Sequence, residues 1–272
     1  MSSQHARIAL VSFELSSGSS IGSRAQRRTQ LLEIIQAARK QQATHVLFPG
    51  WTLVYTPAEH SGGEPQRDLD WLSANGRGLS IMAELTIHHA QGPEFQSPPE
   101  DLGFVSLENG RILDHRIRQV FAQSDHVKKR NELYSQLADD IFAGRRTVTL
   151  GGITFLVLVC GESNFLKNLQ SQHNSIRLRH EVPGQTLPGL RAIDYQVAFN
   201  PAHTELGNLG KMYRRWEWLS QPKRICMFTT NVMPESSGVK AMYCFKNGNQ
   251  QELPAKMSWP DGKSWIMEIV EV

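Results

Sequence analysis

The sequence offers one clear candidate nucleophile, Cys160. It ends the most hydrophobic run, "ITFLVLVC", and is followed directly by Gly161 and Glu162. A side chain at the carboxyl end of a buried strand, on a turn that glycine allows, points into the crevice where α/β sheets bind ligands. This position suits a reactive thiol. It also suits an inert core residue, because free cysteine is among the most buried residue types.

A cysteine nucleophile needs a group that removes or holds its proton. A free thiol has a pKa of about 8.5 and is mostly protonated at neutral pH. Glu162, two residues after Cys160, is one nearby carboxylate, and His203 in "FNPAHT" is a candidate general base for a Cys–His pair. A histidine in such a place is also often a hydrogen-bonded wall residue, and both roles stay open.

The other side chains argue against several classes of protein. The three cysteines, Cys160, Cys226 and Cys244, have no CxxC spacing, which argues against a disulfide framework and a cysteine-based zinc site. The histidines, including the pair at 88–89, show no metal-ligand spacing, so no metal and no cofactor are predicted. The net charge is only +3 and the basic residues are scattered, so no nucleic-acid partner is predicted.

Composition and length predict an ordinary soluble protein. Hydrophobic residues make up 40% of the 272 residues and charged residues 20%. The start, "MSSQHARIALVSF", has no basic region followed by a long apolar run, and no segment approaches the roughly 18 apolar residues of a membrane span. We expect a protein of the reducing cytoplasm without membrane insertion, folded as a single domain over residues 1–272.

The elements that must position Cys160 begin as strand, helix and strand, and continue with hairpins. Asn109-Gly110 and Gly151-Gly152 each separate two apolar runs, as in the tight primed turns of antiparallel pairs. Strands are predicted over 7–13, 44–49, 78–85, 194–200, 224–231, 239–245 and 264–270, helices over 24–42, 66–76, 132–143 and 211–221, and loops over 54–67, 88–101 and 181–189. Mixed strand directions with intervening helices favour a layered α/β sandwich with mixed sheets over a barrel.

The order of these motifs along nearly the whole chain resembles that of the nitrilase (carbon-nitrogen hydrolase) superfamily. The resemblance rests on "THVLFPG", the Gly110 hairpin leading into "RIRQVF", "LVLVCGE", "FNPAHT", the arginine-rich "YRRWEWLS", and "FTTN". It implies a four-layer α-β-β-α sandwich, usually paired as a homodimer. It also implies a small-molecule substrate, attacked at a nitrile or amide carbon by the cysteine of a Glu-Lys-Cys triad.

Carried over position by position, the resemblance makes Cys160 the nucleophile but changes both of its partners. Gly50 in "LFPG" stands where the family has its glutamate, and Arg118 stands at the place of the lysine, or Gln119 if the register slips by one. Arginine keeps the charge but does not readily donate a proton, because its pKa exceeds about 12. Glu132 in "RNELYS" matches a second glutamate of many members, as a candidate to orient the site or replace the base, and equally suits a solvent-facing or capping carboxylate.

The resemblance also outlines a pocket around the nucleophile. The side chain that is missing at Gly50 leaves room for a substrate group, a water or Trp51. Asn200 and His203 match the Asn-Pro turn that borders the pocket in the family. The lysines at 128–129 are close enough in sequence to reach into the site.

Two functions of different class remain open. In the first, the chain is an atypical thiol hydrolase of a small amide, nitrile or other carbon-nitrogen bond, with Cys160 as nucleophile and Arg118 supplying positive charge. In the second, it is a catalytically impaired pseudoenzyme that uses the retained pocket to bind a small molecule or a protein. The glycine at position 50 favours the second function, and the retained cysteine favours the first.

Overall fold

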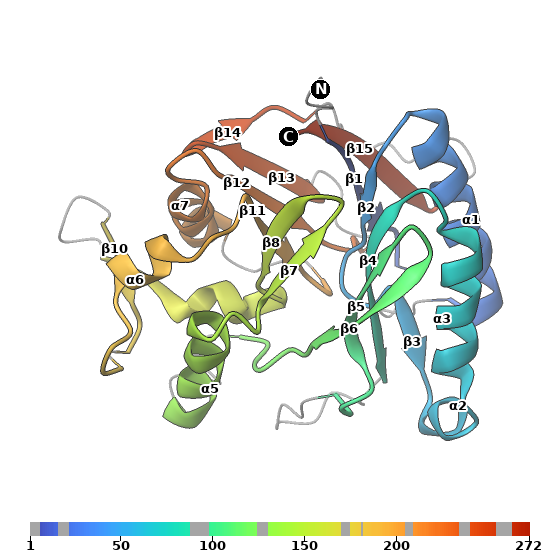
Figure 1. Ribbon diagram of the computed structural model, residues 1–272, viewed down its shortest axis with the longest axis horizontal. Coiled ribbons are helices and arrows are strands. Elements are labelled where there is room, and N and C mark those ends of the chain that lie inside the picture. Colours follow the sequence, from blue (N-terminus) through green and yellow to red (C-terminus); the bar gives the residue numbers. More distant parts are fainter. Residues whose placement is uncertain are drawn as a thin grey trace.

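The chain folds into two large β-sheets packed face to face, with helices on both outer sides (Figure 1). The computed structural model describes residues 6–15, 22–87, 98–123, 130–169, 175–180, 182–204, 209–233, 240–253 and 263–272. The mixed α/β architecture and the α-β-β-α layering that the sequence predicts are confirmed.

The first sheet has seven strands, in the order β15-β1-β2-β4-β5-β6 with β3 paired to β4. Their bounds are β1 (Arg7–Phe13), β2 (His45–Leu47), β3 (Leu53–Tyr55), β4 (Ser80–Ile87), β5 (Gly103–Glu108), β6 (Arg111–Ile117) and β15 (Trp265–Glu271). Strands β1, β2 and β4 run parallel, whereas β15, β5 and β6 join by antiparallel pairing. Helices α1 (Arg24–Lys40) and α3 (Glu64–Asn75) lie along its outer face, and the short α2 (Pro57–Ser61) precedes α3 (Figure 1).

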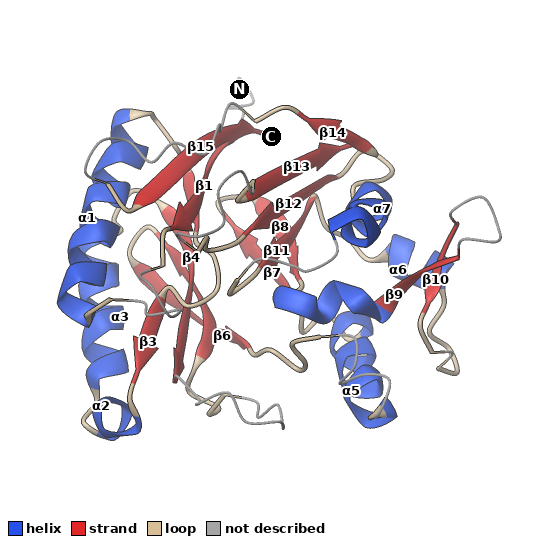
Figure 2. Ribbon diagram, turned by 180° about the vertical axis from the view of Figure 1, so that it is seen from behind, coloured by secondary structure: helices blue, strands red, loops and turns tan. Residues whose placement is uncertain are grey.

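The second sheet has six strands, in the order β14-β13-β12-β11-β8-β7. Their bounds are β7 (Thr147–Leu150), β8 (Ile153–Val157), β11 (Val197–Pro201), β12 (Ile225–Thr229), β13 (Met242–Lys246) and β14 (Asn249–Gln251). Helices α5 (Asn131–Phe142), α6 (Leu187–Ala192) and α7 (Leu209–Leu219), the 3-10 helix η1 (Cys160–Phe165) and the ribbon of β9 (Leu166–Leu169) and β10 (Ser175–Leu178) lie on the side away from the first sheet (Figure 2). Within the described residues, no helix is long and apolar enough to cross a membrane.

The protein has two hydrophobic cores, one on each face of the first sheet, and the side chains of β1 alternate between them. Ile8 and Leu10 belong to the core between the sheets, whereas Ala9 and Val11 belong to the core under α1 and α3. Successive side chains of a strand point to opposite faces, so a strand buried on both faces reads as a continuous apolar run. The run "RIALVSF" is therefore explained by its place between β15 and β2, with a hydrophobic core on each face of the sheet.

Two tight turns confirm the predicted hairpins and tie the sheets together. Asn109 and Gly110 have φ of 51° and 79°, and Gly151 and Gly152 have φ of 53° and 81°, the positive values that primed turns need. The backbone N–H of Gly151 donates to Glu108 of the first sheet at 2.7 Å. The turn of the second sheet is thereby fixed to the end of the first sheet.

The expectation of a loop over 54–67 is wrong. The segment contains the end of β3, the whole of α2 and the beginning of α3. Thr56 and Glu59 cap α2 reciprocally, with Glu59 N–H donating to Thr56 Oγ1 at 3.2 Å and Thr56 N–H to Glu59 Oε2 at 2.8 Å, and Pro57 has a φ already suited to the first helical position.

Two other predicted loops lie only partly within the described residues. The loop predicted over 181–189 gives way to α6 at Leu187, while residue 181 lies outside the described residues. Residues 88–97 of the third predicted loop lie outside them as well. The short strands β9, β10 and β14 were not predicted, and each has only three or four residues.

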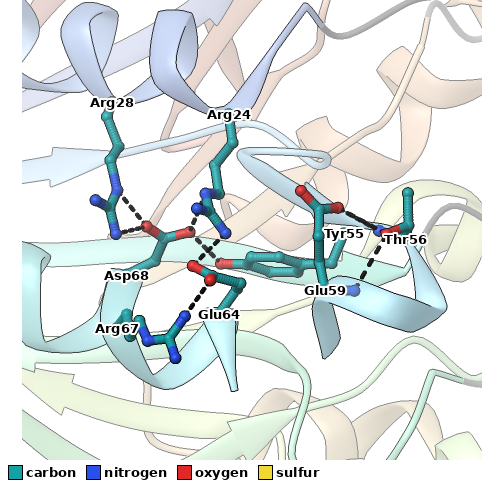
Figure 3. Close-up of polar contacts among 8 residues, drawn as sticks. All are labelled: Arg24, Arg28, Tyr55, Thr56, Glu59, Glu64, Arg67 and Asp68. Carbon is teal, nitrogen blue, oxygen red and sulfur yellow. Dashed lines mark hydrogen bonds and ion pairs between the residues drawn. The ribbon is translucent and has the colours of Figure 1, made fainter. Parts of the chain in front are cut away.

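A buried ion network joins α1 to α3 and β3 (Figure 3). The side chain of Asp68 is fully buried and pairs with Arg28, with Arg24 further away at 4.0 Å. Its second oxygen accepts a hydrogen bond from Tyr55 Oη at 2.9 Å. A buried carboxylate is stable only when it is paired and hydrogen-bonded, so these partners fix the helices over the sheet that carries part of the site described next.

Candidate active site

Cys160 lies on a sharp turn where β8 ends and η1 begins. Its φ is +51° and it is 9% exposed. A positive φ in a residue with a side chain costs free energy, and such residues occur in turns and are enriched at functional sites. A Cβ atom on Gly161 would lie 1.9 Å from the backbone oxygen of Ala122, so only glycine fits after the cysteine. The segment that follows β6 is thus packed directly against the nucleophile turn.

Asn200 supports this turn from the end of β11. Its Nδ2 donates to the carbonyl oxygens of Leu158 and Cys160, the latter at 2.9 Å, while its Oδ1 accepts from Trp216 Nε1 at 3.0 Å. Every polar atom of the buried amide therefore has a partner. The residue that the sequence placed at the border of the pocket holds the backbone of the nucleophile.

Glu162 anchors the turn at Cys160 to the segment that follows β6. Its carboxylate accepts from the backbone N–H groups of Val120 at 2.6 Å and Val159 at 2.7 Å, and pairs with Arg146. Burial raises the pKa of Glu162, while Arg146 and the two backbone donors lower it. Arg146 in turn donates to the backbone oxygen of Arg118 at 2.9 Å. Glu162 is fully engaged as a structural anchor, and both of its oxygens are occupied.

His203 contacts both the nucleophile and a buried carboxylate. Its Nε2 lies 2.8 Å from Oε2 of Glu84, and their side chains are 12% and 3% exposed. The side chain of Cys160 lies close enough to the ring to help raise the pKa of His203. The three residues form a Cys-His-Glu arrangement of the kind in which a carboxylate orients a histidine beside a nucleophile.

The backbone around Gly50 orients this group. Oε2 of Glu84 also accepts a hydrogen bond from the N–H of Trp51 at 2.6 Å. The N–H of Gly50 donates to Ala202 at 3.0 Å. The Trp51 ring lies against the imidazole of His203, with their centroids 5.1 Å apart. The segment "LFPGW", which begins at the last residue of β2, therefore forms one wall of the site.

Asn231 clamps the two segments that meet at the histidine. It is fully buried, and its Nδ2 donates to the backbone oxygens of Gly50 at 2.7 Å and His203 at 2.8 Å. A Cβ atom on Gly50 would lie 2.4 Å from Cδ2 of His203. The imidazole thus fills space that any side chain at position 50 would enter.

The electrostatic surroundings make His203 strongly basic. Burial alone would lower its pKa, but the Glu84 charge and the hydrogen bonds to Cys160 and Glu84 raise the pKa from 6.5 to about 10. The imidazole is therefore protonated at neutral pH. Beside a cysteine, a protonated imidazole is the cation that stabilises a thiolate.

The side chains of Arg118 and Glu132, two catalytic candidates from the sequence, make their contacts with residues other than Cys160. Arg118 donates from Nε at 3.0 Å and from Nη2 at 2.6 Å to the backbone oxygen of Pro98. Glu132 has a side chain that is 65% exposed, and it pairs with Arg130 at 2.8 Å. The hydrogen bond from Arg130 lowers the pKa of Glu132. Each of these charges is occupied away from the nucleophile turn.

The sequence offered Gln119 as an alternative to Arg118, and the lysines at 128–129 as further candidates to reach into the site. Gln119 is buried, with its Nε2 donating to the backbone oxygen of Phe121 at 3.2 Å. The lysines at 128–129 lie outside the described residues. In the part of the chain that is described, no group of three or more His, Cys, Asp and Glu side chains is arranged to hold a metal ion.

Sequence reasoning missed Glu84 and Asn231. Glu84 is the single charged residue of the buried strand "SIMAELTI". A carboxylate in an otherwise apolar run is rarely buried without a partner, and that signal could have identified it. Asn231 follows "FTT" at the end of β12, and only its two backbone contacts reveal its role.

Comparison with solved structures identifies the class of fold. No family model matches the sequence, and no curated protein matches it. An amidase from Nesterenkonia sp. AN1 superposes with a TM-score of 0.58 at 15% identity, covering 98% of this chain and 93% of the other. Glutamine-dependent NAD+ synthetases from Acinetobacter baumannii and Cytophaga hutchinsonii superpose with TM-scores of 0.58 and 0.56 at 13% and 10% identity. The chain has the fold of the nitrilase superfamily, the carbon-nitrogen hydrolase fold.

The extent of these similarities differs. The chain covers 98% of its own length in both synthetase comparisons but spans only 45% and 43% of the synthetase chains. The Nesterenkonia amidase is from the nitrilase superfamily, and its E41Q mutant shows covalent addition of the acetamide moiety of fluoroacetamide at the active-site cysteine. At such low identity the similarity establishes the fold.

Proposed function

We propose that the chain is a thiol hydrolase of carbon-nitrogen bonds in which His203, oriented by Glu84, serves Cys160 in place of the glutamate expected at Gly50. One observation carries this proposal. The imidazole is hydrogen-bonded to Glu84, lies close enough to Cys160 for that side chain to raise its pKa, and stands in the space that a side chain at position 50 would occupy.

In the first half of the reaction, the Cys160 thiolate attacks the carbonyl carbon of a bound amide. The new carbon–sulfur bond pushes the carbonyl electron pair onto oxygen and gives a tetrahedral intermediate. As this intermediate collapses, the carbon–nitrogen bond breaks and the His203 imidazolium gives its proton to the leaving nitrogen. The amine departs, and a thioester on Cys160 and a neutral imidazole remain.

In the second half, the neutral imidazole acts as the base. His203 takes a proton from a water molecule as the oxygen of that water attacks the thioester carbon. The carbon–sulfur bond breaks, the carboxylic acid leaves, and the thiolate and imidazolium are restored. Glu84 stabilises the imidazolium in each cycle, because its carboxylate lies 2.8 Å from Nε2.

The oxyanion needs a hydrogen-bond donor, and we assign the backbone N–H of Gly161 to it. This amide follows the nucleophile on a turn with positive φ at Cys160, the geometry in which the next backbone N–H faces the developing charge. It makes none of the backbone hydrogen bonds found outside helices and strands among the described residues. Removing an oxyanion donor typically costs about 100- to 1000-fold in rate.

A second function is favoured by the placement of Arg118. Its guanidinium is taken up by the backbone oxygen of Pro98 instead of lying beside the sulfur. An enzyme of this fold without a cation at the oxyanion would be slow, and the pocket would then serve to bind a small molecule or a protein. The hydrolase and the pseudoenzyme differ in whether Cys160 forms an acyl adduct.

The deciding experiment is intact-protein mass spectrometry after incubation with a panel of small amides and nitriles, together with an ammonia assay. The hydrolase predicts an adduct on Cys160 and ammonia release, both absent in the Cys160→Ala variant. Cys226 and Cys244 serve as internal controls, because burial raises the pKa of both thiols. If the wild-type chain forms no adduct and releases no ammonia with any compound, the hydrolase proposal is wrong.

A further inference from the structure

The ribbon of β9 and β10 projects from the body of the molecule beside α6 (Figures 1 and 2). Among the described residues its two strands pair only with each other, as a separate two-stranded sheet. Strand β9 follows η1 directly, so the ribbon begins where the element that carries Cys160 ends. A two-stranded ribbon is only marginally stable by itself, so it depends on contacts with the rest of the protein or with a partner.

One face of the ribbon is covered by the rest of the protein. Leu166 and Leu178 lie directly opposite each other and are buried, and Ile176 on the same face packs against the larger hydrophobic core. Asn168 Nδ2 donates to the backbone oxygen of Lys211 at 3.1 Å, which ties β9 to α7. Successive side chains of a strand alternate between its two faces, so the intervening residues of the ribbon point outward.

The outward face carries two positive charges directly opposite each other. Lys167 of β9 is the register partner of Arg177 of β10. Arg177 is exposed and Lys167 is half-buried, and neither side chain pairs with a carboxylate in the part of the chain that the structure describes. Like charges that face each other on neighbouring strands destabilise the pairing. A carboxylate beside the two side chains would replace this repulsion with attractive contacts.

The free edge of β10 is a second feature that points to a partner. Within the described residues, β10 pairs with β9 on one side and with no strand on the other. An edge strand presents backbone N–H and C=O groups to which another extended chain can add. Residues two apart in an extended chain point to the same face, so acidic residues at every second position would lie beside Arg177 and within reach of Lys167.

The size of the charged patch favours a protein segment over the other common anionic partners. Membrane surfaces are recognised by clusters of about four to eight basic residues. Duplex DNA carries one negative charge about every 1.7 Å, which calls for a long row of basic residues. The outward face of the ribbon offers two cations and the half-buried Leu169. Such a small mixed surface matches a short acidic peptide.

We propose that the ribbon of β9 and β10 is the docking site for an extended acidic segment of another protein. The segment adds to the free edge of β10 as a third strand, and its carboxylates contact Arg177 and Lys167. Backbone hydrogen bonds supply the affinity of such an added strand, and the side chains at alternate positions supply the specificity. The assignment goes beyond the proposed hydrolase function and does not depend on it.

The binding test uses fluorescence anisotropy with three labelled peptides of about ten residues. The first alternates threonine with glutamate, the second has glutamine in place of glutamate, and the third has proline in place of threonine. The wild-type chain is expected to bind the first peptide at least about 10-fold more tightly than either of the others. The glutamine peptide lacks the charge, and the proline peptide keeps the charge but cannot donate backbone hydrogen bonds to β10. Equal affinities for all three peptides would overturn the proposal.

Charge reversal on the ribbon locates the binding site. Lys167→Glu combined with Arg177→Glu is expected to weaken binding of the threonine–glutamate peptide by at least about 10-fold. Lys223→Glu combined with Lys246→Glu is the matched control, because both lysines are exposed and the net charge of the chain changes equally. The control should bind the peptide as the wild type does. An equal loss of affinity in both double variants would show general charge attraction and contradict the proposal.

The same variants decide between the possible occupants of the ribbon. Wild-type self-association that the ribbon variant loses, without peptide binding, would identify a second copy as the occupant and contradict the proposal. Binding of a DNA duplex that the ribbon variant loses, again without peptide binding, would contradict it as well. Cys160→Ala is expected to bind the peptide with wild-type affinity, so failure of the hydrolase proposal leaves this test unaffected.

Discussion

The imidazole of His203 occupies the space that a side chain on residue 50 would need, so the two cannot be present together. A Cβ atom there would be 2.4 Å from Cδ2 of the ring and 3.0 Å from the backbone nitrogen of His203. The ring could rotate away, but the backbone is held by Asn231. The glycine and the histidine therefore form a matched pair, and replacing the glycine with glutamate would displace the group that contacts Cys160.

Gly50→Ala is therefore expected to disturb the site. Overpacking of a tight position costs typically about 1–3 kcal/mol, and here the displaced group is the His203 imidazole near Cys160. Urea unfolding should show the lost stability, and alkylation of Cys160 by iodoacetamide should slow. Gly62→Ala is the control, since a Cβ there meets its nearest atom at 3.2 Å and φ is −77°. Unchanged stability and labelling in Gly50→Ala would contradict the packing described for His203.

Removing the histidine or its carboxylate should lower the reactivity of Cys160. Loss of a positioned proton-transfer group commonly costs about 100- to 10,000-fold in turnover. We expect a loss of this size for His203→Gln and a smaller loss for Glu84→Gln, measured as ammonia release with the best amide found. Glu132→Gln should retain wild-type rates, because that side chain is exposed and paired with Arg130. Equal rates in all three variants would exclude a role for the Cys-His-Glu arrangement.

The raised pKa of His203 predicts how stability depends on pH. Its pKa is about 10 in the folded chain against 6.5 for an ordinary histidine, so the folded state binds the proton more tightly. The stabilisation is fully present below about pH 6.5 and is lost as the pH rises through about 10. At about 1.4 kcal/mol for each pKa unit, its size is on the order of 5 kcal/mol. The difference in unfolding free energy between wild type and His203→Gln should shrink over this range, and a constant difference would contradict the assignment.

The ion network of Figure 3 predicts a loss of stability that leaves the chemistry of the site intact. Asp68→Asn leaves the Arg28 guanidinium without its buried counterion, and breaking such a pair costs about 3–5 kcal/mol. Thermal unfolding should show this loss. Asp70→Asn on the same helix should be neutral, because Asp70 is exposed. At a temperature where the variant is folded, Cys160 should react at the wild-type rate, and a slower rate would link this network to the site.

The parts of the fold that were predicted are those governed by local patterns. The hairpin at Asn109-Gly110 follows from the turn preference of that dipeptide, and β1 follows from its apolar run. The segment over 54–67 was misjudged because its proline and glycine content suggests a loop, whereas Thr56 and Pro57 start a helix. Composition alone does not distinguish a helix cap from a turn.

The residues of the candidate site also fall into two groups, those that a local motif identifies and those that only the structure brings together. Cys160 and Gly161 are next to each other in sequence, so one motif identifies both. Glu84 and His203 are 119 positions apart and meet only because β4 and β11 lie in two sheets that face each other. No spacing rule connects such a pair, and a contact of this kind can be found only from the structure or from the presence of a buried charge without a local partner.

The assembly of the site from both sheets has a consequence for folding kinetics. Contacts between distant parts of the chain form late, because closing long loops costs entropy before the contacts can compensate for it. The contact of Glu84 with His203 closes 119 residues of chain, so the imidazole reaches Cys160 only after the two sheets have docked. During synthesis and refolding, we therefore expect the Cys160 thiol to lack its neighbouring imidazole until one of the last events.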